Sequence, residues 1–218
     1  MEKRTLELAV RAANIDEIQT LMARYVTNCL KMDYESSLEQ LFAMDHPEVS
    51  FELMESGEYK GPEQVRAYMM ALHGRARAFE EKTGWMEFQH LTTPKIVISE
   101  DGTGDRAVGQ WTILSPWAKM ATPYPCEERK LTAMWFIGRY QNEFVKVDGE
   151  WKILKLHLIA YVRTPYEQGW MKQADCMRLA PFRDLRPDNP PRYYTFHPDA
   201  IYSYDNIYNW GPYVPEKI

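Results

Sequence analysis

The sequence has little cysteine, and none of it at a spacing that would serve structure. Cys29, Cys126 and Cys176 are the three cysteines in 218 residues, and they form no C-x-x-C pair. An odd number of widely spaced cysteines argues against a disulfide framework and against a zinc ribbon. The pattern is typical of free thiols in a reducing compartment, so we expect a cytoplasmic protein.

Long apolar runs and an excess of basic residues are missing as well. No stretch approaches the roughly 20 apolar residues of a membrane-spanning helix. The opening "MEKRTLELAVRAAN" lacks the apolar block and cleavage site of a secretory signal. The formal net charge is −5 and the basic residues are scattered, whereas nucleic acids and anionic membranes call for a basic surface. We therefore expect a soluble protein that binds neither nucleic acid nor membrane.

Metal-binding motifs are also lacking among the five histidines. There is no H-x-H and no H-E-x-x-H spacing, so we predict no metal site and no cofactor. His46 and His197 precede prolines in loop-like segments, and His73 falls on a helical pattern beside methionines. This leaves His90 and His157 as the histidines that could carry chemistry.

Helical periodicity occupies the first part of the chain. Asn14, with Glu17 three residues later, has the form of a capping box and predicts a helix start. A second helix is predicted over "YESSLEQLFA", and a third opens at Gly61–Pro62, since proline suits the first helical position. The first helix carries one apolar stripe, formed by Ile15, Ile18, Met22, Tyr25 and Cys29.

Strand periodicity follows from His90 onward. The segments "HLTTPKIVIS", "DRAVGQWTIL", "LTAMWFIGRYQNEFVKV" and "EWKILKLHLIAYV" predict four strands, and Asp148–Gly149 is a strong hairpin signal. A shorter strand, "SFEL", precedes the third helix, and "SPWAKMATPYPCEERK" is predicted to be a long loop. Helices followed by an antiparallel meander predict an α+β fold with the helices on one face of a curved sheet.

The composition changes after the last predicted strand. Residues 163–218 are dense in proline, tyrosine and tryptophan and show little periodicity. Disordered segments are poor in aromatic residues, so we predict an α+β domain over 1–162 followed by an extended arm. The arm would pack on its own domain or on a neighbouring subunit. It leads us to expect a homo-oligomer, a dimer or a trimer.

Several blocks of the sequence resemble the SnoaL-like proteins of the nuclear transport factor 2-like superfamily. They include "ARYV", "LFAMDHPEVSFE", "GEYKGPEQVRAYM", "HLTTPKIVISEDG", "GRYQNEFVKVDGEWKI" and "LHLIAY", and they run from about Ile15 to Trp170. Relatives include scytalone dehydratase, ketosteroid isomerase and polyketide cyclases. The resemblance implies a cone-shaped α+β fold with its site on the concave face, between the first helix and the sheet. It does not specify the reaction, because this fold hosts many functions.

In the dehydratase members of the family, a histidine shuttles protons, an aspartate orients it and a tyrosine polarises a carbonyl. Carried over by position, the resemblance assigns these roles to His90, Asp33 and Tyr25. Asp33 could equally cap the second helix, and Tyr25 could be a core residue on the stripe of its helix. Both alternatives stay open at the level of sequence.

The stretch "MEFQHLTTPKIVIS" decides how His90 is interpreted. His90 alternates with Phe88, Ile96 and Ile98, so it is expected to point toward the core, provided that no bulge forms near Pro94. An imidazole there suits general base catalysis, because its unperturbed pKa of about 6.5 lies near neutral pH. A buried neutral histidine bonded to a backbone carbonyl would give the same pattern.

Further candidates complete the predicted site. His157 is a candidate second acid or base, although Lys155 shares its alternation phase and leaves its face of the strand undecided. The residues expected to bind substrate in an apolar pocket are Glu52, Tyr59, Trp111, Met134, Trp135 and Phe136.

The resemblance and these residues together imply an enzyme: a cofactor-independent, dehydratase-like lyase or isomerase. Its substrate would be a small hydrophobic, cyclic or aromatic hydroxy-carbonyl compound. Two alternatives remain. One is a module that binds a small ligand or scaffolds a partner without chemistry, and the other is a polyketide-type aldol cyclase.

Overall fold

The structure, a computed structural model, describes residues 2–53, 56–80, 86–101, 103–120, 131–169 and 185–189. The helices are α1 (Glu2–Leu30), α2 (Tyr34–Gln40) and α3 (Gly61–Glu80). The strands are β1 (Ser50–Leu53), β2 (Glu58–Lys60), β3 (Met86–Glu87), β4 (His90–Ile98), β5 (Arg106–Met120), β6 (Leu131–Val147) and β7 (Glu150–Pro165).

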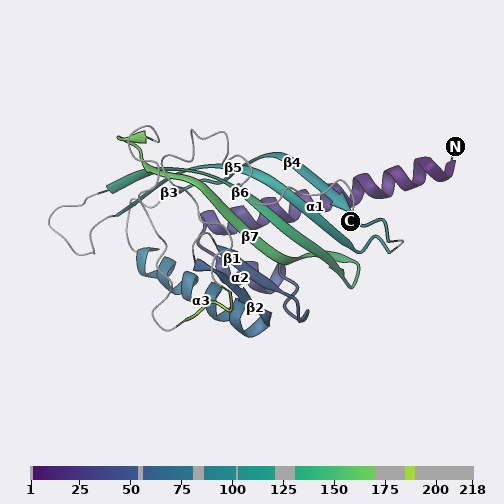
Figure 1. Cartoon of the computed structure of the whole chain (residues 1–218), viewed down its shortest axis with the longest axis horizontal. Coiled ribbons are helices and arrows are strands. Elements are labelled where there is room, and N and C mark those ends of the chain that lie inside the picture. The colour runs from purple at the N-terminus through teal and green to yellow at the C-terminus, as the bar shows by residue number, and fades with distance from the viewer. Residues whose placement is uncertain are drawn as a thin grey trace.

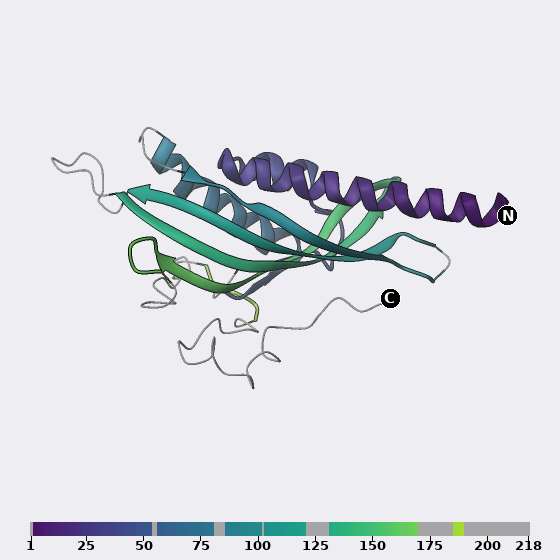
Figure 2. The same cartoon turned by 90° about the horizontal axis from the view of Figure 1, so that it is seen from above.

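The three helices lie on one side of a single, strongly curled sheet (Figures 1 and 2). The strand order is β2-β1-β7-β6-β5-β3, and β4 also pairs with β5. The predicted α+β class is thus confirmed, and so is the antiparallel meander from β4 to β7. The sheet as a whole is mixed, because β1 pairs in parallel with β7. Periodicity shows that a segment is a strand but not which strand it pairs with or in which direction.

Helix α1 is longer than predicted. The expected start at Asn14 is wrong, since the helix begins at Glu2. The segment before Asn14 is rich in leucine, alanine, glutamate and arginine, all good helix formers, and it stays largely exposed, with Leu6 at 65%. It projects past the end of the sheet (Figure 2). Asn14 is instead buried, and its Oδ1 accepts a hydrogen bond from Nε1 of Trp151 at 3.1 Å.

The main core fills the space between the helices and the concave face of the sheet. The α1 stripe contributes Ile18, Met22, Tyr25 and Cys29, each at most 4% exposed, which confirms the predicted face of this helix. The same cluster contains Phe51 from β1 and Trp111 and Ile113 from β5.

Irregular positions in the strands decide which residues face this core. The β4–β5 register shifts between Thr92 and Lys95, where Thr93 has a positive φ of 45°. The β6–β7 register shifts twice, at Ile137/Gly138 and at Glu143/Phe144. Because side chains alternate between faces with a period of two, each extra residue inverts the alternation beyond it.

The predicted hairpin at Asp148–Gly149 is confirmed. Both residues have positive φ, 51° and 83°, which a two-residue turn matching the twist of the strands requires. The predicted long loop begins later than expected. Its first six residues, 115–120, belong to β5, because β6 offers backbone partners as far as Met120. Its remainder, residues 121–130, lies outside the described residues.

The region predicted as an arm is described in part. Arg163–Pro165 still belong to β7. Asn189 forms an antiparallel bridge with Glu58 of β2, and the amide of Lys60 donates to Oδ2 of Asp188 at 2.7 Å. Residues 170–184 and 190–218 lie outside the described residues, so the packing of the arm stays a prediction.

Among the described helices, none has both the length and the apolar character needed to cross a membrane.

Candidate functional site

Near β3, at one end of the sheet, the strand register shows which side chains lie on the concave face. The register gives this information because Cα partners in neighbouring strands point to the same face. One row runs from Glu87 through Trp117 to Met134, and the next runs from Ser115 through Phe136 to Arg163. Phe136 belongs to the core beneath the helices. Both rows therefore face α1 rather than the outer surface.

A chain of hydrogen bonds crosses this face. Oε1 of Gln89 accepts a hydrogen bond from the hydroxyl of Tyr140 at 2.6 Å, and its Nε2 donates to Oε1 of Glu87 at 2.8 Å. Tyr140 is 1% exposed, whereas Glu87 and Gln89 are half-buried. Gln89 thus fixes the carboxyl group of β3 relative to the phenol of β6.

Helix α1 extends the chain into the helical layer. Tyr25 forms side-chain hydrogen bonds with the thiol of Cys29 and with the hydroxyl of Tyr140. The rings of Tyr25 and Tyr140 meet edge to face, with centroids 6.0 Å apart. Tyr34, at the start of α2, is half-buried and interacts electrostatically with Glu87. We call Tyr25, Tyr34, Glu87, Gln89 and Tyr140 the concave cluster.

Burial controls the protonation of this cluster. It raises the pKa of Glu87 above its usual range, and the hydrogen bond from Gln89 offsets this only in part. Burial also raises the pKa of Tyr25, Tyr34 and Tyr140, with nearby thiol, phenol and carboxyl groups adding to the effect. The phenols therefore stay neutral hydrogen-bond donors, and the carboxyl group becomes a stronger base once it is ionised.

His90 does not join the cluster. Its side chain is exposed, its ring stacks on Phe88 at 6.3 Å, and its Cα partner Leu114 is 40% exposed. The expected inward orientation is therefore wrong. The bulge between Thr92 and Lys95 inverts the alternation, so Ile96 packs against the core while His90 faces the other way.

Asp33 takes the role of a helix cap. Its Oδ1 accepts a hydrogen bond from the amide of Ser36 at 3.1 Å, as the N-cap of α2. This satisfies an amide that the first helical turn leaves without a partner. His90 lies on the outer face of β4, and Tyr25 lies on the buried stripe of α1. The roles that the resemblance assigns to Asp33 and Tyr25 stay predictions.

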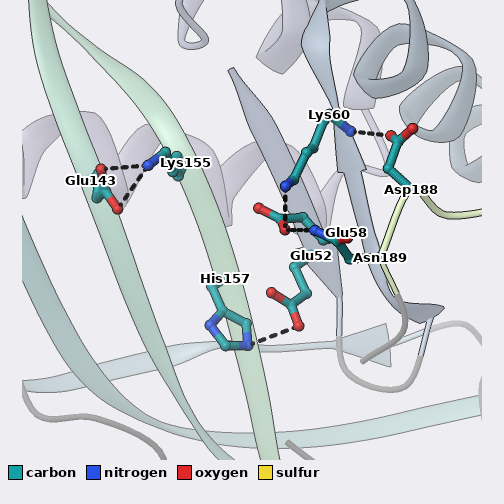
Figure 3. A network of polar contacts seen from close by, with 8 residues as sticks. All are labelled: Glu52, Glu58, Lys60, Glu143, Lys155, His157, Asp188 and Asn189. Carbon is teal, nitrogen blue, oxygen red and sulfur yellow. Dashed lines mark hydrogen bonds and ion pairs between the residues drawn. The ribbon is translucent and has the colours of Figure 1, made fainter. Parts of the chain in front are cut away.

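Glu52 and His157 come together on the opposite face of the sheet (Figure 3). They are Cα partners in β1 and β7, with 3.5 Å between Oε1 of Glu52 and Nε2 of His157. Nearby on that face, Lys155 pairs with Glu143 at 3.0 Å. Glu52 and His157 are both buried, but they lie across the sheet from Tyr140 and Glu87.

The residues expected to bind substrate divide between the two faces. Trp111, Met134 and Phe136 lie buried on the concave face, and their role in binding substrate stays a prediction. Tyr59 is a core residue that stacks on Tyr68, with ring centroids 4.2 Å apart. Trp135 points to the outer face, where it meets Tyr166 at 6.1 Å.

The family follows from a match over most of the chain. Residues 10–157 match the SnoaL-like domain. The chain belongs to the SnoaL-like family. The cone-shaped α+β fold implied by the sequence resemblance is thereby confirmed, together with the placement of its concave face beneath the first helix.

Solved structures give the same fold at low sequence identity. One is titled a putative scytalone dehydratase from Novosphingobium aromaticivorans. It is 18% identical with a TM-score of 0.55, and the match covers 81% of this chain and 97% of that one. A hexachlorocyclohexane dehydrochlorinase of the LinA type from Novosphingobium barchaimii is 19% identical, with a TM-score of 0.50 and coverages of 71% and 91%.

A third structure is titled a putative dehydratase of the NTF2-like family from Streptomyces avermitilis. It is 15% identical with a TM-score of 0.51, and the match covers 68% of this chain and 97% of that one. At these identities the likeness establishes the fold alone. No curated protein matches the chain significantly.

Sequence reasoning missed most of the polar side chains that this SnoaL-like domain brings together. Glu87, Gln89 and Leu91 alternate in "MEFQHL", and that alternation is a signal for a shared face. This signal was hidden because His90 lies between Gln89 and Leu91. Counting every second residue from His90 leads to Ile96 and Ile98, which lie beyond the bulge. Tyr140 lies in a strand of mixed composition, and only its partner Trp111 reveals which way it points.

Proposed function

We propose that this SnoaL-like protein is a cofactor-independent lyase or isomerase acting on a small cyclic or aromatic hydroxy-carbonyl compound. The observation that carries the proposal is a half-buried carboxyl group with a raised pKa, Glu87, in hydrogen-bonded contact with a phenol network. A perturbed carboxyl group beside fixed donors on an otherwise apolar face is a common arrangement in acid–base sites.

In the first step, the carboxylate of Glu87 takes a proton from the carbon next to the substrate carbonyl. The electron pair of that C–H bond moves toward the carbonyl, and its oxygen gains negative charge as an enolate. The hydroxyls of Tyr34 and Tyr25 are the donors that we assign to this oxygen. Their raised pKa keeps them protonated, so they can stabilise the enolate throughout the reaction.

In the second step, Glu87 returns the proton. In a dehydration, the enolate reforms the carbonyl, a carbon–carbon double bond forms, and the hydroxyl on the next carbon leaves as water after receiving that proton. In an isomerisation, the proton goes back to a different carbon of the same conjugated system. Ketosteroid isomerase, which has a related fold, likewise combines a carboxylate base with neutral oxyanion donors in an apolar site.

Gln89 and Tyr140 act behind these groups as positioning residues. Gln89 holds the carboxyl group of Glu87 in one orientation, and Tyr140 holds Gln89. The hydroxyl of Tyr140 already donates to Gln89, in keeping with a supporting role. A positioned acid or base typically contributes about 10²–10⁴-fold to the rate, and misplacement of its support loses part of that gain.

The test is a turnover assay on a panel of cyclic β-hydroxy ketones, followed by variants assayed on the best substrate. We expect Glu87→Gln to lower kcat by about 10²–10⁴-fold, because the amide has nearly the same shape but cannot take the proton. Glu39→Gln, the same change at an exposed site on α2, should leave kcat unchanged.

A parallel His90→Ala variant separates this proposal from the shuttle that the family resemblance implies. If His90→Ala lost activity while Glu87→Gln kept it, the carboxylate would not be the base. A third outcome would favour a module that binds a ligand without chemistry. In that case wild type and Glu87→Gln would bind the panel compounds equally well, and neither protein would convert any of them.

A further inference from the structure

The outer face of the sheet is buried over β7 and its two neighbours, β1 and β6. Glu52 and His157 point to this face, and so does Arg139, which precedes the inward-facing Tyr140; each of the three is at most 7% exposed. Ile159, the Cα partner of Arg139, is 3% exposed, yet it lies outside the main core cluster of the described residues. All three described helices lie on the other side of the sheet (Figure 2). They do not account for this burial, so another part of the protein must cover the face.

The buried part of the outer face is small and has clear limits. Thr112 and Leu114 of β5 also point outward, but both are exposed. Along β7 the buried part runs from His157 to Thr164, whereas Lys155 is only half-buried. These limits enclose about 10 Å by 23 Å, far less than the roughly 800 Å² that each partner buries in a standard protein–protein interface. This size fits a single chain segment better than a second subunit.

Residues 185–189 fix the start of the C-terminal arm against β2 (Figure 3). The amide of Glu58 donates to the carbonyl oxygen of Asn189 at 2.9 Å, and Nδ2 of Asn189 donates to Oε2 of Glu58 at 2.9 Å. A Cβ added to Gly57 would lie 2.5 Å from the same carbonyl oxygen and 2.7 Å from Cβ of Pro187. The segment thus packs too closely on β2 to leave room for one methyl group, and it closes an edge strand that would otherwise be open to pairing.

The arm leaves this anchor beside the buried part of the outer face. Glu58 is the Cα partner of Glu52, and Glu52 is the Cα partner of His157, so all three side chains point outward. Two strand spacings, about 10 Å, separate β2 from β7, and about three extended residues cover that distance. Residues 190–218, which follow the anchor, are therefore long enough to cross the buried part.

Residues 190–218 also have the side chains that such a cover requires. A cover over carboxylate, imidazole and guanidinium groups must offer hydrogen bonds as well as apolar surface, because the burial of polar groups is otherwise costly. Tyrosine supplies both, with a large ring and a hydroxyl that forms a hydrogen bond when buried. Six of the chain's 14 tyrosines lie in residues 190–218, whereas residues 170–184, which also lie outside the described residues, have none.

We propose that residues 190–218 cover the outer face of their own sheet over β1, β7 and β6, with tyrosine hydroxyls bonded to the polar side chains there. The occupant is the chain's own arm rather than a second copy, because the burial is present in a single chain and the anchor at Asn189 lies at its border. A partner subunit can then use only the uncovered part of this face, over β4 and β5, where His90 and Leu114 are exposed.

The test uses the full-length protein with single tyrosines of the arm replaced by the photocrosslinking amino acid p-benzoylphenylalanine. Tyr194, Tyr204 and Tyr213 sample the length of the arm, and an aromatic replacement keeps the bulk of the side chain. After irradiation we expect a product of monomer size on a denaturing gel, in which mass spectrometry of tryptic peptides finds the arm joined to β1, β6 or β7. Leu6, 65% exposed on α1, is the matched control position and should give no link to these strands.

Three results would overturn the inference. A cross-linked product of dimer size would mean that the arm covers a neighbouring subunit. Links from the arm to the helices or to β4, or no link from any of the three positions, would mean that something other than residues 190–218 covers the outer face. The inference is independent of the proposed reaction, because Glu87 lies on the concave face and takes no part in this test.

Discussion

Gly138 is the position where one added methyl group most directly tests how the sheet is built. A Cβ there would overlap the carbonyl oxygen of Ile159 and lie 2.9 Å from ring carbons of Phe136. The carbonyl belongs to the backbone beside the β7 bulge, so it can move away only if the bulge itself changes. Overpacking of this kind typically costs about 1–3 kcal/mol, and a rigid backbone neighbour favours the upper part of that range.

The measurement is urea unfolding of Gly138→Ala and wild type, followed by fluorescence. We expect a loss of about 1–3 kcal/mol in the free energy of unfolding. In a chain of this length that corresponds to a fall of about 2–12 °C in Tm.

Gly74→Ala is the matched control. Gly74 lies inside α3, and a Cβ added there meets nothing within 4 Å. In a helix interior alanine is favoured over glycine by about 0.5–1 kcal/mol, so this variant should be slightly more stable than wild type. The same chemical change thus has opposite signs at the two sites. A Gly138→Ala protein within about 0.5 kcal/mol of wild type would refute the packing argument for the bulge.

Two further predictions concern ionisation and capping. The pKa of Glu87 is raised in the folded protein, so the folded state holds this proton more tightly than the unfolded chain, and stability falls as pH rises from the unfolded to the folded pKa. Glu87→Gln should remove that fall, so Tm at pH 7 minus Tm at pH 4, measured by thermal melts, should be more positive for the variant than for wild type. An unchanged signed difference would contradict the prediction. Asp33→Ala should cost about 0.5–2 kcal/mol through loss of the α2 cap with kcat preserved in the turnover assay. A large fall in kcat with stability unchanged would favour the orienting role that the resemblance assigns to Asp33.

The candidate site shows which sequence signals are reliable. Tyr25 could be placed on the inner face from sequence, because α1 has one unbroken helical period and one apolar stripe. The face of His90 could not be predicted, because one extra residue near Thr93 reverses the direction of the side chains that precede it in β4. Pro94 marks the region as irregular, but proline does not reveal whether the chain adds a residue there.

The cluster around Glu87 depends on contacts between distant segments. Gln89 connects to Tyr140 across 51 positions of sequence, and no local pattern records that pairing. The pKa of Glu87 is likewise a product of burial by other elements. Glu87 and Glu52 are both glutamates in strands, and the sequence does not show that Glu87 lies on the concave face whereas Glu52 lies on the opposite face.

By itself the sequence determined the order of the three helices and of the strands other than β2 and β3, the class of the fold, the inner stripe of α1 and the tight turn at Asp148–Gly149. These are properties of local backbone preference and of regular hydrophobic period, which act over a few residues. Tertiary structure decided the parallel pairing of β1 with β7 and the faces of His90 and Arg163. The reason is that bulges form where a strand must follow its neighbour around a curved sheet, so the direction of a side chain depends on the partner strand as well as on its own sequence.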